Sequence, residues 1–384
     1  MTPPDPRARC LALLASGLDM GTLHIAESGG VQETLRGALP GVTAKMVLRT
    51  PAVYDTLVNK GAFGFFESWM RGDITRENIG LLVYLVVSNK RLLESLTKIP
   101  TSHLNPQRRY PLSMVHPDFL SVWMGKTVSF GAGFFDGIVE TLDQAIAARH
   151  QTIKDAMMLR AHDSILYIGQ TMGSFAAFFA ENHTSSRLHV LTHGHLQKQT
   201  LQQDMRIRGF DKRVTADSFD DTTLQGRYDF IVVNHLWETL PPNQWDHVFY
   251  KLKDMLRPEG RIIVQIILAE SPPPQRTTRR TKTSPPNLWS LMAHENARFM
   301  SQEAFLAYAQ KNYLRVRDQK PYPKDMARTC KLLRASLDSH APDLRSHPDG
   351  NTHRLFWSFL LSVLEATCLQ GTLIPTHWVL EHDV

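Results

Sequence analysis

Four short apolar runs in the middle of the chain, separated by helix-like segments, constrain the fold most strongly. The runs are SILYI (164–168), LHVLTH (188–193), YDFIVVNH (228–235) and RIIVQIIL (261–268). The helix-like segments between them cover about 174–183, 196–209 and 243–256. Continuously apolar strands that alternate with helices are typical of a parallel sheet covered on both faces. The sequence therefore predicts a doubly wound, mostly parallel α/β sheet that binds its ligands at the carboxyl ends of the strands.

The segment TSHLNPQRRYPL (101–112) is polar and interrupted by proline, which indicates a linker. We expect residues 1–100 to form a small N-terminal domain and residues 113–384 to form the larger domain that holds the sheet. Within the small domain, residues 42–58 indicate a strand and a turn. Thr75 is the expected cap of a helix through TRENIGLLVYLVVSNKRLLESL.

The larger domain contains further elements outside the alternating series. The pattern predicts an amphipathic helix over 141–159, a helix and a strand within 300–319, and an apolar helix and a final strand within 353–384.

A basic, proline-rich segment at 271–287 interrupts the pattern. It contains five prolines and four cations, Arg276, Arg279, Arg280 and Lys282, and no acidic residue. Such a composition favours a flexible loop. Two interpretations are open: a solvated insertion without function, or a peripheral contact with anionic lipid headgroups, to which each cation would contribute about 1 kcal/mol.

The bulk composition limits the compartment and the partners. The net charge of +6 is compatible with membrane surfaces, phosphorylated ligands or nucleic acid, but the 276–282 cluster has no interleaved aromatic residues, so nucleic acid is not expected. Cys10, Cys330 and Cys368 are too scattered for a disulfide framework, and no histidine spacing indicates a metal. The longest apolar run, Ile79–Val87, has 9 residues, whereas a bilayer span needs about 20. We expect a cytoplasmic protein that contacts a membrane, if at all, peripherally from its inner face.

Several motifs, in this order, resemble the cyclopropane fatty acid synthases and their mycolic-acid and C-methyltransferase relatives. The motifs are GAFGFFESWMRGDI (61–74), HPDFLSVWM (116–124), ETLDQA (140–145), LKDMLRPEGRIIVQII (252–267), DMARTCKLL (325–333) and FWSFLLSVLEATCLQGTLIPTHWVL (356–380). The resemblance implies an S-adenosylmethionine (SAM) fold with a small N-terminal α+β domain. It also implies a reaction on the unsaturated acyl chain of a phospholipid or another hydrophobic substrate, in which bound bicarbonate takes up a proton.

The cofactor loop of that family corresponds to YIGQTMGS, which keeps the outer glycines, Gly169 and Gly173. Tyr167 stands at the family's acidic position and Thr171 at its middle glycine, where the backbone has to approach the ligand closely. The resemblance also implies cofactor-binding roles for Gln199, in THGHLQKQ, and for Asp217, in TADSFDD. The alternative is a loop that only joins a strand to a helix.

The bicarbonate ligands of the family are kept in part. Glu238 and Ile267 match, and Gln265 replaces a histidine and can still donate to an anion. Phe130 and Met326 stand where the family has a cysteine and a tyrosine. Loss of two donors leaves a buried bicarbonate under-satisfied, so Glu238 becomes a candidate base itself.

His235 is expected to form part of the substrate pocket wall with Phe130 and Met326. The alternative for Glu238 is a structural role as a helix cap.

Three functions follow from these expectations. The first is a SAM-dependent methyl or methylene transferase that acts on a lipid acyl chain. The second is a non-catalytic subunit that binds lipid or a partner, and the third is a pocket repurposed for other chemistry on a hydrophobic substrate. A homodimer is compatible with each of them.

Overall fold

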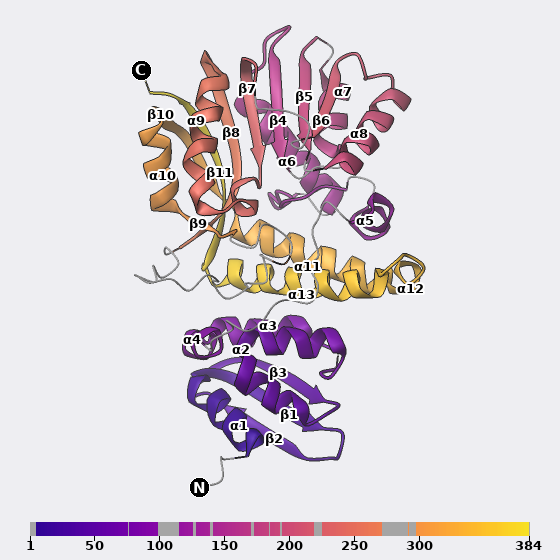
Figure 1. Cartoon of the computed structure of the whole chain (residues 1–384), viewed down its shortest axis with the longest axis vertical. Coiled ribbons are helices and arrows are strands. Elements are labelled where there is room, and N and C mark those ends of the chain that lie inside the picture. The colour runs from indigo at the N-terminus through magenta and orange to yellow at the C-terminus, as the bar shows by residue number, and fades with distance from the viewer. Residues whose placement is uncertain are drawn as a thin grey trace.

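The computed structural model describes residues 5–75, 77–98, 115–125, 128–138, 141–169, 173–183, 185–192, 194–218, 225–270, 291 and 297–383. Two sheets organise this part of the chain, and two long helices lie between them (Figure 1). The expected linker at 101–112 and the basic segment at 271–287 lie outside the described residues.

The N-terminal part is a three-stranded sheet in the order β2-β1-β3, packed against helices. Its strands are β1 (Met20–Glu27), β2 (Gln32–Arg36) and β3 (Leu39–Leu48), and its helices are α1 (Pro6–Gly17), α2 (Ala52–Arg71), α3 (Ile79–Ser88) and α4 (Lys90–Lys98). Strand β1 is antiparallel to β2 and parallel to β3. The strand expected within 42–58 is present, but the turn after it leads directly into α2, which the sequence pattern did not predict.

The helix expected from Thr75 onward is wrong in its start and its length. Helix α3 begins only at Ile79, and the chain leaves it at Asn89 before α4 starts. The buried Asn89 side chain explains the break, because it accepts hydrogen bonds from the backbone N–H groups of Asp19 and Met20 and donates to the Met20 carbonyl oxygen. An asparagine that bonds to a distant backbone in this way competes with the continuation of a helix.

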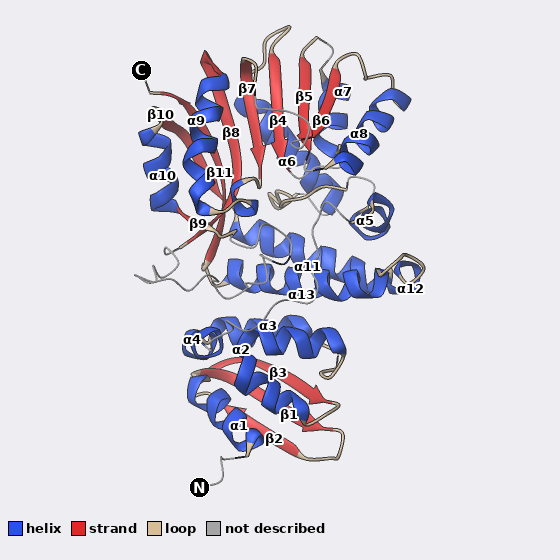
Figure 2. Ribbon diagram, in the orientation of Figure 1, coloured by secondary structure: helices blue, strands red, loops and turns tan. Residues whose placement is uncertain are grey.

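The larger sheet has the order β10-β11-β8-β7-β4-β5-β6, with β9 beside β8 (Figure 2). Its strands are β4 (Ser164–Gly169), β5 (Arg187–Thr192), β6 (Val214–Ser218), β7 (Tyr228–Asn234), β8 (Leu256–Ala269), β9 (Met300–Ser301), β10 (Leu314–Pro321) and β11 (Leu373–His382). Strands β4 to β9 pair in parallel, whereas β11 is antiparallel to both β8 and β10. The predicted mostly parallel α/β sheet is confirmed.

Helices cover both faces of this sheet. Phe249 of α9 (Trp245–Met255) and Phe305 of α10 (Gln302–Lys311) share an apolar cluster with Val264 on one face. On the other face, helices α6 (Leu142–Met157), α7 (Ser174–Asn182) and α8 (His195–Ile207) pack against β4 and β5. Helix α6 begins with a capping box between Thr141 and Gln144, as is typical of a stable helix start.

Helices α11 (Pro323–Ser339) and α13 (Gly350–Leu369) lie between the two sheets, with α5 (Pro117–Met124) and the short α12 (Ala341–Leu344) beside them (Figure 1). Phe66 and Trp69 of α2 belong to the same apolar cluster as Phe356 and Phe359 of α13. The Trp69 Nε1–H also donates to the Leu355 carbonyl oxygen at 3.3 Å. The division into domains 1–100 and 113–384 stays a prediction. Within the described residues, no helix combines the length and the apolar character that crossing a bilayer requires.

Candidate functional site

The carboxyl ends of β7 and β8 bring four of the expected site residues together. After β7 ends, His235 adopts a positive φ of 52°, and a 3-10 turn over Trp237–Thr239 directs Glu238 inward. Glu238 Oε1 accepts hydrogen bonds from His235 Nδ1 at 2.9 Å and from the Ile267 backbone N–H at 2.6 Å. The His235 backbone N–H donates to the Gln265 carbonyl oxygen at 2.9 Å. We call Glu238, His235 and Ile267 the base cluster.

The hydrogen bond within this cluster fixes the tautomer of His235. A carboxylate oxygen accepts hydrogen bonds, so Nδ1 donates to Glu238 Oε1, and the neutral imidazole in this tautomer has its free electron pair on Nε2. Nε2 is buried and has no hydrogen-bond partner among the described residues. A carboxylate that orients an imidazole in this way is a frequent arrangement for a general base.

His235 opens into an apolar cavity of about 80 Å³ below the strand ends. Phe130, Ile267 and Met326 line it as well, so the predicted pocket residues share one cavity. Trp357 supplies an aromatic wall, with its ring centroid 5.5 Å from that of Trp123 and 6.4 Å from that of Phe130.

Helix α13 contributes cavity residues that sequence reasoning missed. These are Trp357, Leu360, Leu361 and Leu364, and the three leucines follow Trp357 by three, four and seven positions along the helix. This spacing marks a single helix face. The signal was present in the sequence, but it indicates burial and does not by itself say that the face borders a cavity.

At the end of β4, two glycines are required by geometry. Gly169 has a φ of 139°, and a Cβ at this position would collide with the carbonyl oxygen of Asn234 on β7. Gly173, with a φ of 99°, precedes the first residue of α7, and its Cβ would lie 2.8 Å from Leu201. Residues 170–172, which include Thr171, lie outside the described residues. Tyr167 packs in the core and stacks on Phe175, with ring centroids 5.1 Å apart.

The start of α8 places two glutamines on opposite sides. Gln199 is exposed, whereas Gln197 is 1% exposed and its amide has no hydrogen-bond partner among the described residues. Gln197 lies one turn before Leu201, so it shares the helix face that approaches Gly173. The cofactor role of Gln199 stays a prediction, but the geometry favours Gln197 for it.

The carboxylate of Asp217, at the end of β6, lies close to the side chains of a histidine and a lysine. Its carboxylate lies 3.1 Å from His189 Nε2 and 3.2 Å from Lys198 Nζ. The role expected for it near an adenine ring stays a prediction.

The residues at this edge fit a SAM-like cofactor. Gly169 and Gly173 leave backbone without side chains where β4 meets α7, and the buried Gln197 amide lacks the partner that a buried polar group requires. These three residues would hold the cofactor. For bicarbonate the fit is poorer, because Phe130 and Met326 are apolar walls of the cavity.

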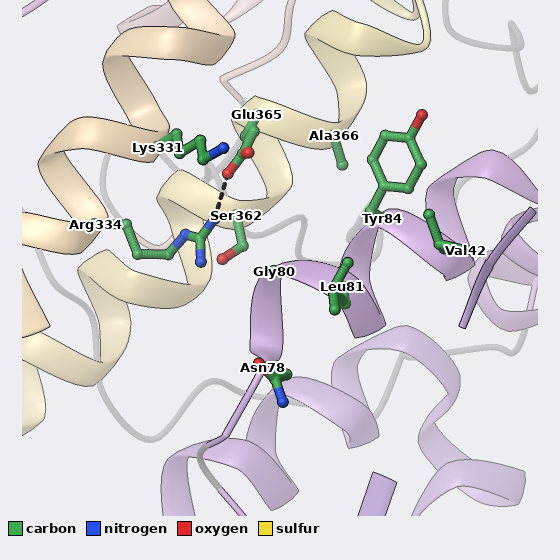
Figure 3. A pocket seen from close by; sticks show the side chains of 10 residues that line it. All are labelled: Val42, Asn78, Gly80, Leu81, Tyr84, Lys331, Arg334, Ser362, Glu365 and Ala366. Atoms are coloured by element: carbon green, nitrogen blue, oxygen red, sulfur yellow. Dashed lines mark hydrogen bonds and ion pairs between the residues drawn. The ribbon is translucent and has the colours of Figure 1, made fainter. Parts of the chain in front are cut away.

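A second, larger cavity of about 350 Å³ lies elsewhere, between α3 and the α11–α13 pair (Figure 3). Its lining mixes apolar and charged side chains, and Arg334 Nη2 forms an ion pair with Glu365 Oε2 at 2.5 Å, drawn as a dashed line in Figure 3. Among the described residues, those that line this cavity include neither the end of a strand of the larger sheet nor a candidate general base. The smaller apolar cavity is therefore the candidate active site.

Comparisons with known proteins agree with this geometry. The family model described as mycolic acid cyclopropane synthetase matches residues 101–370. Tuberculostearic acid methyltransferase UfaA1 of Mycobacterium tuberculosis (strain ATCC 25618 / H37Rv) is 23% identical over 412 residues, which cover 98% of this chain and 93% of that protein.

Two solved structures show the same fold. Coclaurine N-methyltransferase, bound to N-methylheliamine and SAH, superposes with a TM-score of 0.65 at 16% identity, over 83% of this chain and 99% of its own. The cyclopropane synthase MmaA2 from Mycobacterium tuberculosis gives a TM-score of 0.59 at 15% identity, over 69% of this chain and 94% of its own. The chain therefore belongs to the mycolic acid cyclopropane synthetase family, as a divergent SAM-dependent methyltransferase with the class I fold.

Proposed function

We propose that the protein transfers a methyl or methylene group from SAM to the double bond of a lipid acyl chain, with His235 as the proton acceptor. One observation supports this proposal: His235, whose Nδ1 is hydrogen-bonded to Glu238, lines an apolar cavity at the carboxyl ends of the strands.

The chemistry of the cavity supports a hydrocarbon substrate. Its lining is dominated by aliphatic and aromatic side chains, including Ile267, Met326 and Trp357. Such a lining excludes water and binds an acyl chain through buried apolar area. One relative, UfaA1, is named a tuberculostearic acid methyltransferase, which agrees with a fatty acyl substrate.

Bound SAM would supply an electrophilic methyl group. A neutral alkene that gains a methyl cation has to lose one proton to end as a neutral product. His235 Nε2 accepts that proton, and the Glu238 carboxylate stabilises the resulting imidazolium through the Nδ1–H hydrogen bond. A proton lost from the new methyl group closes a cyclopropane ring, and a proton lost from the chain leaves a methylated alkene. No step in this sequence requires bicarbonate.

The aromatic walls support the same reaction. Trp357 and Phe130 border the cavity, and the faces of aromatic rings attract positive charge. They stabilise the developing cation without competing with the base for its proton.

The proposal is tested with the purified protein, SAM labelled in its methyl group, and vesicles of a phospholipid with a monounsaturated chain. Mass spectrometry of the lipid should show one added labelled carbon per modified chain. We expect Glu238→Gln and His235→Asn to lower the rate by about 10²- to 10⁴-fold, the usual contribution of a general base. Asparagine is chosen for position 235 because it tolerates a positive φ.

Glu259→Gln is the matched control, because this glutamate is exposed on the protein surface and should leave the rate unchanged. Wild-type rates in both base-cluster variants would contradict the assignment of the base. A wild-type protein that binds S-adenosylhomocysteine (SAH) yet labels no unsaturated lipid would favour the non-catalytic lipid-binding function.

A further inference from the structure

The cavity of about 350 Å³ between α3 and the α11–α13 pair has a positively charged lining (Figure 3). Three charged side chains line it: Lys331 and Arg334 of α11, and Glu365 of α13. Arg334 Nη2 is paired with Glu365 Oε2, so the carboxylate neutralises one of the two cations. Lys331 forms no ion pair with a described residue. The lining therefore keeps one net positive charge.

The start of α3 adds to this positive potential. The helix begins at Ile79, its first turn contains no acidic residue, and the Asn78 side chain makes no capping hydrogen bond. The first turn of a helix carries a partial positive charge. The Arg334 guanidinium lies directly over this turn, because a Cβ on Gly80 would be 2.7 Å from both Nη1 and Nη2. Glu77 is exposed and does not line the cavity. Two electropositive groups thus lie against each other, an arrangement that an anion beside them would stabilise.

Arg334 has donors to spare for such an anion. A guanidinium has five N–H donors, and the hydrogen bond to Glu365 uses one of them. The side chain is only 20% exposed, and its Nε is buried without a hydrogen-bond partner among the described residues. Buried polar groups are rarely left without a partner. Arg334 can therefore serve Glu365 and a bound anion at the same time.

The remaining walls suit an organic ligand better than a bare ion. Val42, Leu81 and Ala366 give the cavity an apolar side. The Tyr84 ring borders it too, and the Tyr84 hydroxyl accepts a hydrogen bond from Gln370 Nε2 at 2.9 Å, which ties α3 to the end of α13. The volume falls in the range of about 300 to 1,000 Å³ that is usual for small-molecule sites.

We propose that this cavity binds a phosphate ester, with Lys331, Arg334 and the start of α3 around the phosphate group. Val42, Leu81 and Ala366 contact the apolar part of the ligand. A phosphate fits better than a planar anion, because its tetrahedral oxygens accept hydrogen bonds from donors that converge from different elements. The ligand joins β3 and α3 of the N-terminal part to α11 and α13. The site is separate from the base cluster and does not rest on the proposed function.

Two sources share this chemistry: a small soluble phosphate ester and the glycerophosphate region of a phospholipid. Calorimetric titration of the full chain with glycerol 3-phosphate and with monomeric dihexanoylphosphatidylglycerol separates them. Tighter binding of the short-chain lipid assigns the cavity to a phospholipid, and tighter binding of glycerol 3-phosphate assigns it to a soluble ester. Glycerol, which lacks the phosphate, is the control ligand and should not bind. If neither phosphate ester binds, the inference is overturned.

Variants of Lys331 show whether the bound ester occupies this cavity. Lys331→Glu reverses the charge of an exposed side chain, so we expect the fold to be kept and the affinity for the ester to fall by about 10- to 100-fold. Lys331→Arg keeps the charge and should retain binding. Lys324→Glu is the matched control, because Lys324 is exposed two turns earlier on α11 and does not line the cavity. Equal affinities of the two glutamate variants would overturn the inference.

Repeating the titrations with saturating SAH separates this site from the cofactor site at the strand ends. We expect SAH to leave the affinity for the ester unchanged. Displacement of the ester by SAH would mean that it binds at the strand ends, which also overturns the inference. If SAH itself does not bind, the proposed function fails, whereas ester binding that depends on Lys331 still supports the second site.

Discussion

The two halves of the candidate site are built in opposite ways. At the ends of β7 and β8, the base cluster is joined by its own hydrogen bonds, and Glu238 Oε1 serves two donors at once. At the ends of β4 and β5, Gly169 and Gly173 provide backbone without side chains, and Gln197 has a buried amide without a partner among the described residues. The protein's own hydrogen bonds thus hold the base cluster in place, whereas the cofactor half of the site offers groups that a bound ligand would contact.

The largest effect is expected where the two halves touch. Gly169→Ala places a methyl group against the Asn234 carbonyl oxygen at a φ of 139°, so both the β4 and the β7 end have to move. We expect a loss of at least about 3 kcal/mol in the free energy of unfolding, together with loss of SAH binding. Chemical denaturation and calorimetry measure these two effects. Gly29→Ala is the control, because a Cβ there meets no atom within 4 Å. Equal stability of the two variants would show that the halves are not coupled through Gly169.

A somewhat smaller effect on the free energy of unfolding is expected from acid, through the buried His377 of β11. Burial lowers the pKa of His377 to about 4, from 6.5 for a free histidine. Between these values the unfolded chain binds more protons than the folded chain, so stability falls as the pH drops from about 6.5 towards 4. The contribution of His377 is at most about 3 kcal/mol and is fully present above pH 6.5.

Urea denaturation at a series of pH values checks this prediction. His377→Asn should flatten the slope between about pH 4 and 6.5, whereas the exposed His247→Asn should keep the wild-type slope. An unchanged slope in His377→Asn would mean that the folded protein admits the proton and that His377 is not closed off from water.

The smallest expected effect is a difference in SAH affinity between variants of the two glutamines at the start of α8. Gln197→Ala removes the buried amide that we expect to contact the cofactor, so SAH affinity should fall by about 5- to 10-fold, equivalent to about 1 kcal/mol. Gln199→Ala alters an exposed side chain and should bind SAH as the wild type does. Calorimetric titration compares the two. The reverse order of effects would place the cofactor contact on the outer side of α8.

Much of the main sheet could be predicted from the sequence because β4, β5, β7 and β8 are largely apolar and buried, whereas β10 is polar and exposed along most of its length. The grouping of Glu238, Gln265 and Ile267 was implied by the resemblance to the family, and it agrees with the rule that the ends of neighbouring parallel strands meet at one edge. Local patterns failed where a distant contact decides the structure, as at Asn89, whose side chain bonds to the backbone at Met20 and ends a helix.

The cofactor role predicted for Gln199 shows a second limit of what can be predicted from the sequence. Whether residue 197 or 199 points inward depends on the residue at which α8 begins, and a shift of two positions rotates a helix face by more than half a turn.

The α11–α13 pair has a consequence for how the two cavities respond to one another. Cys330 and Leu333 line the smaller, apolar cavity, while Lys331 and Arg334, their neighbours on α11, line the larger one. The partition between the two spaces is therefore a single layer of helix. Because one helix forms a wall of both spaces, a substitution on α11 that repacks the lining of one cavity also alters the wall of the other.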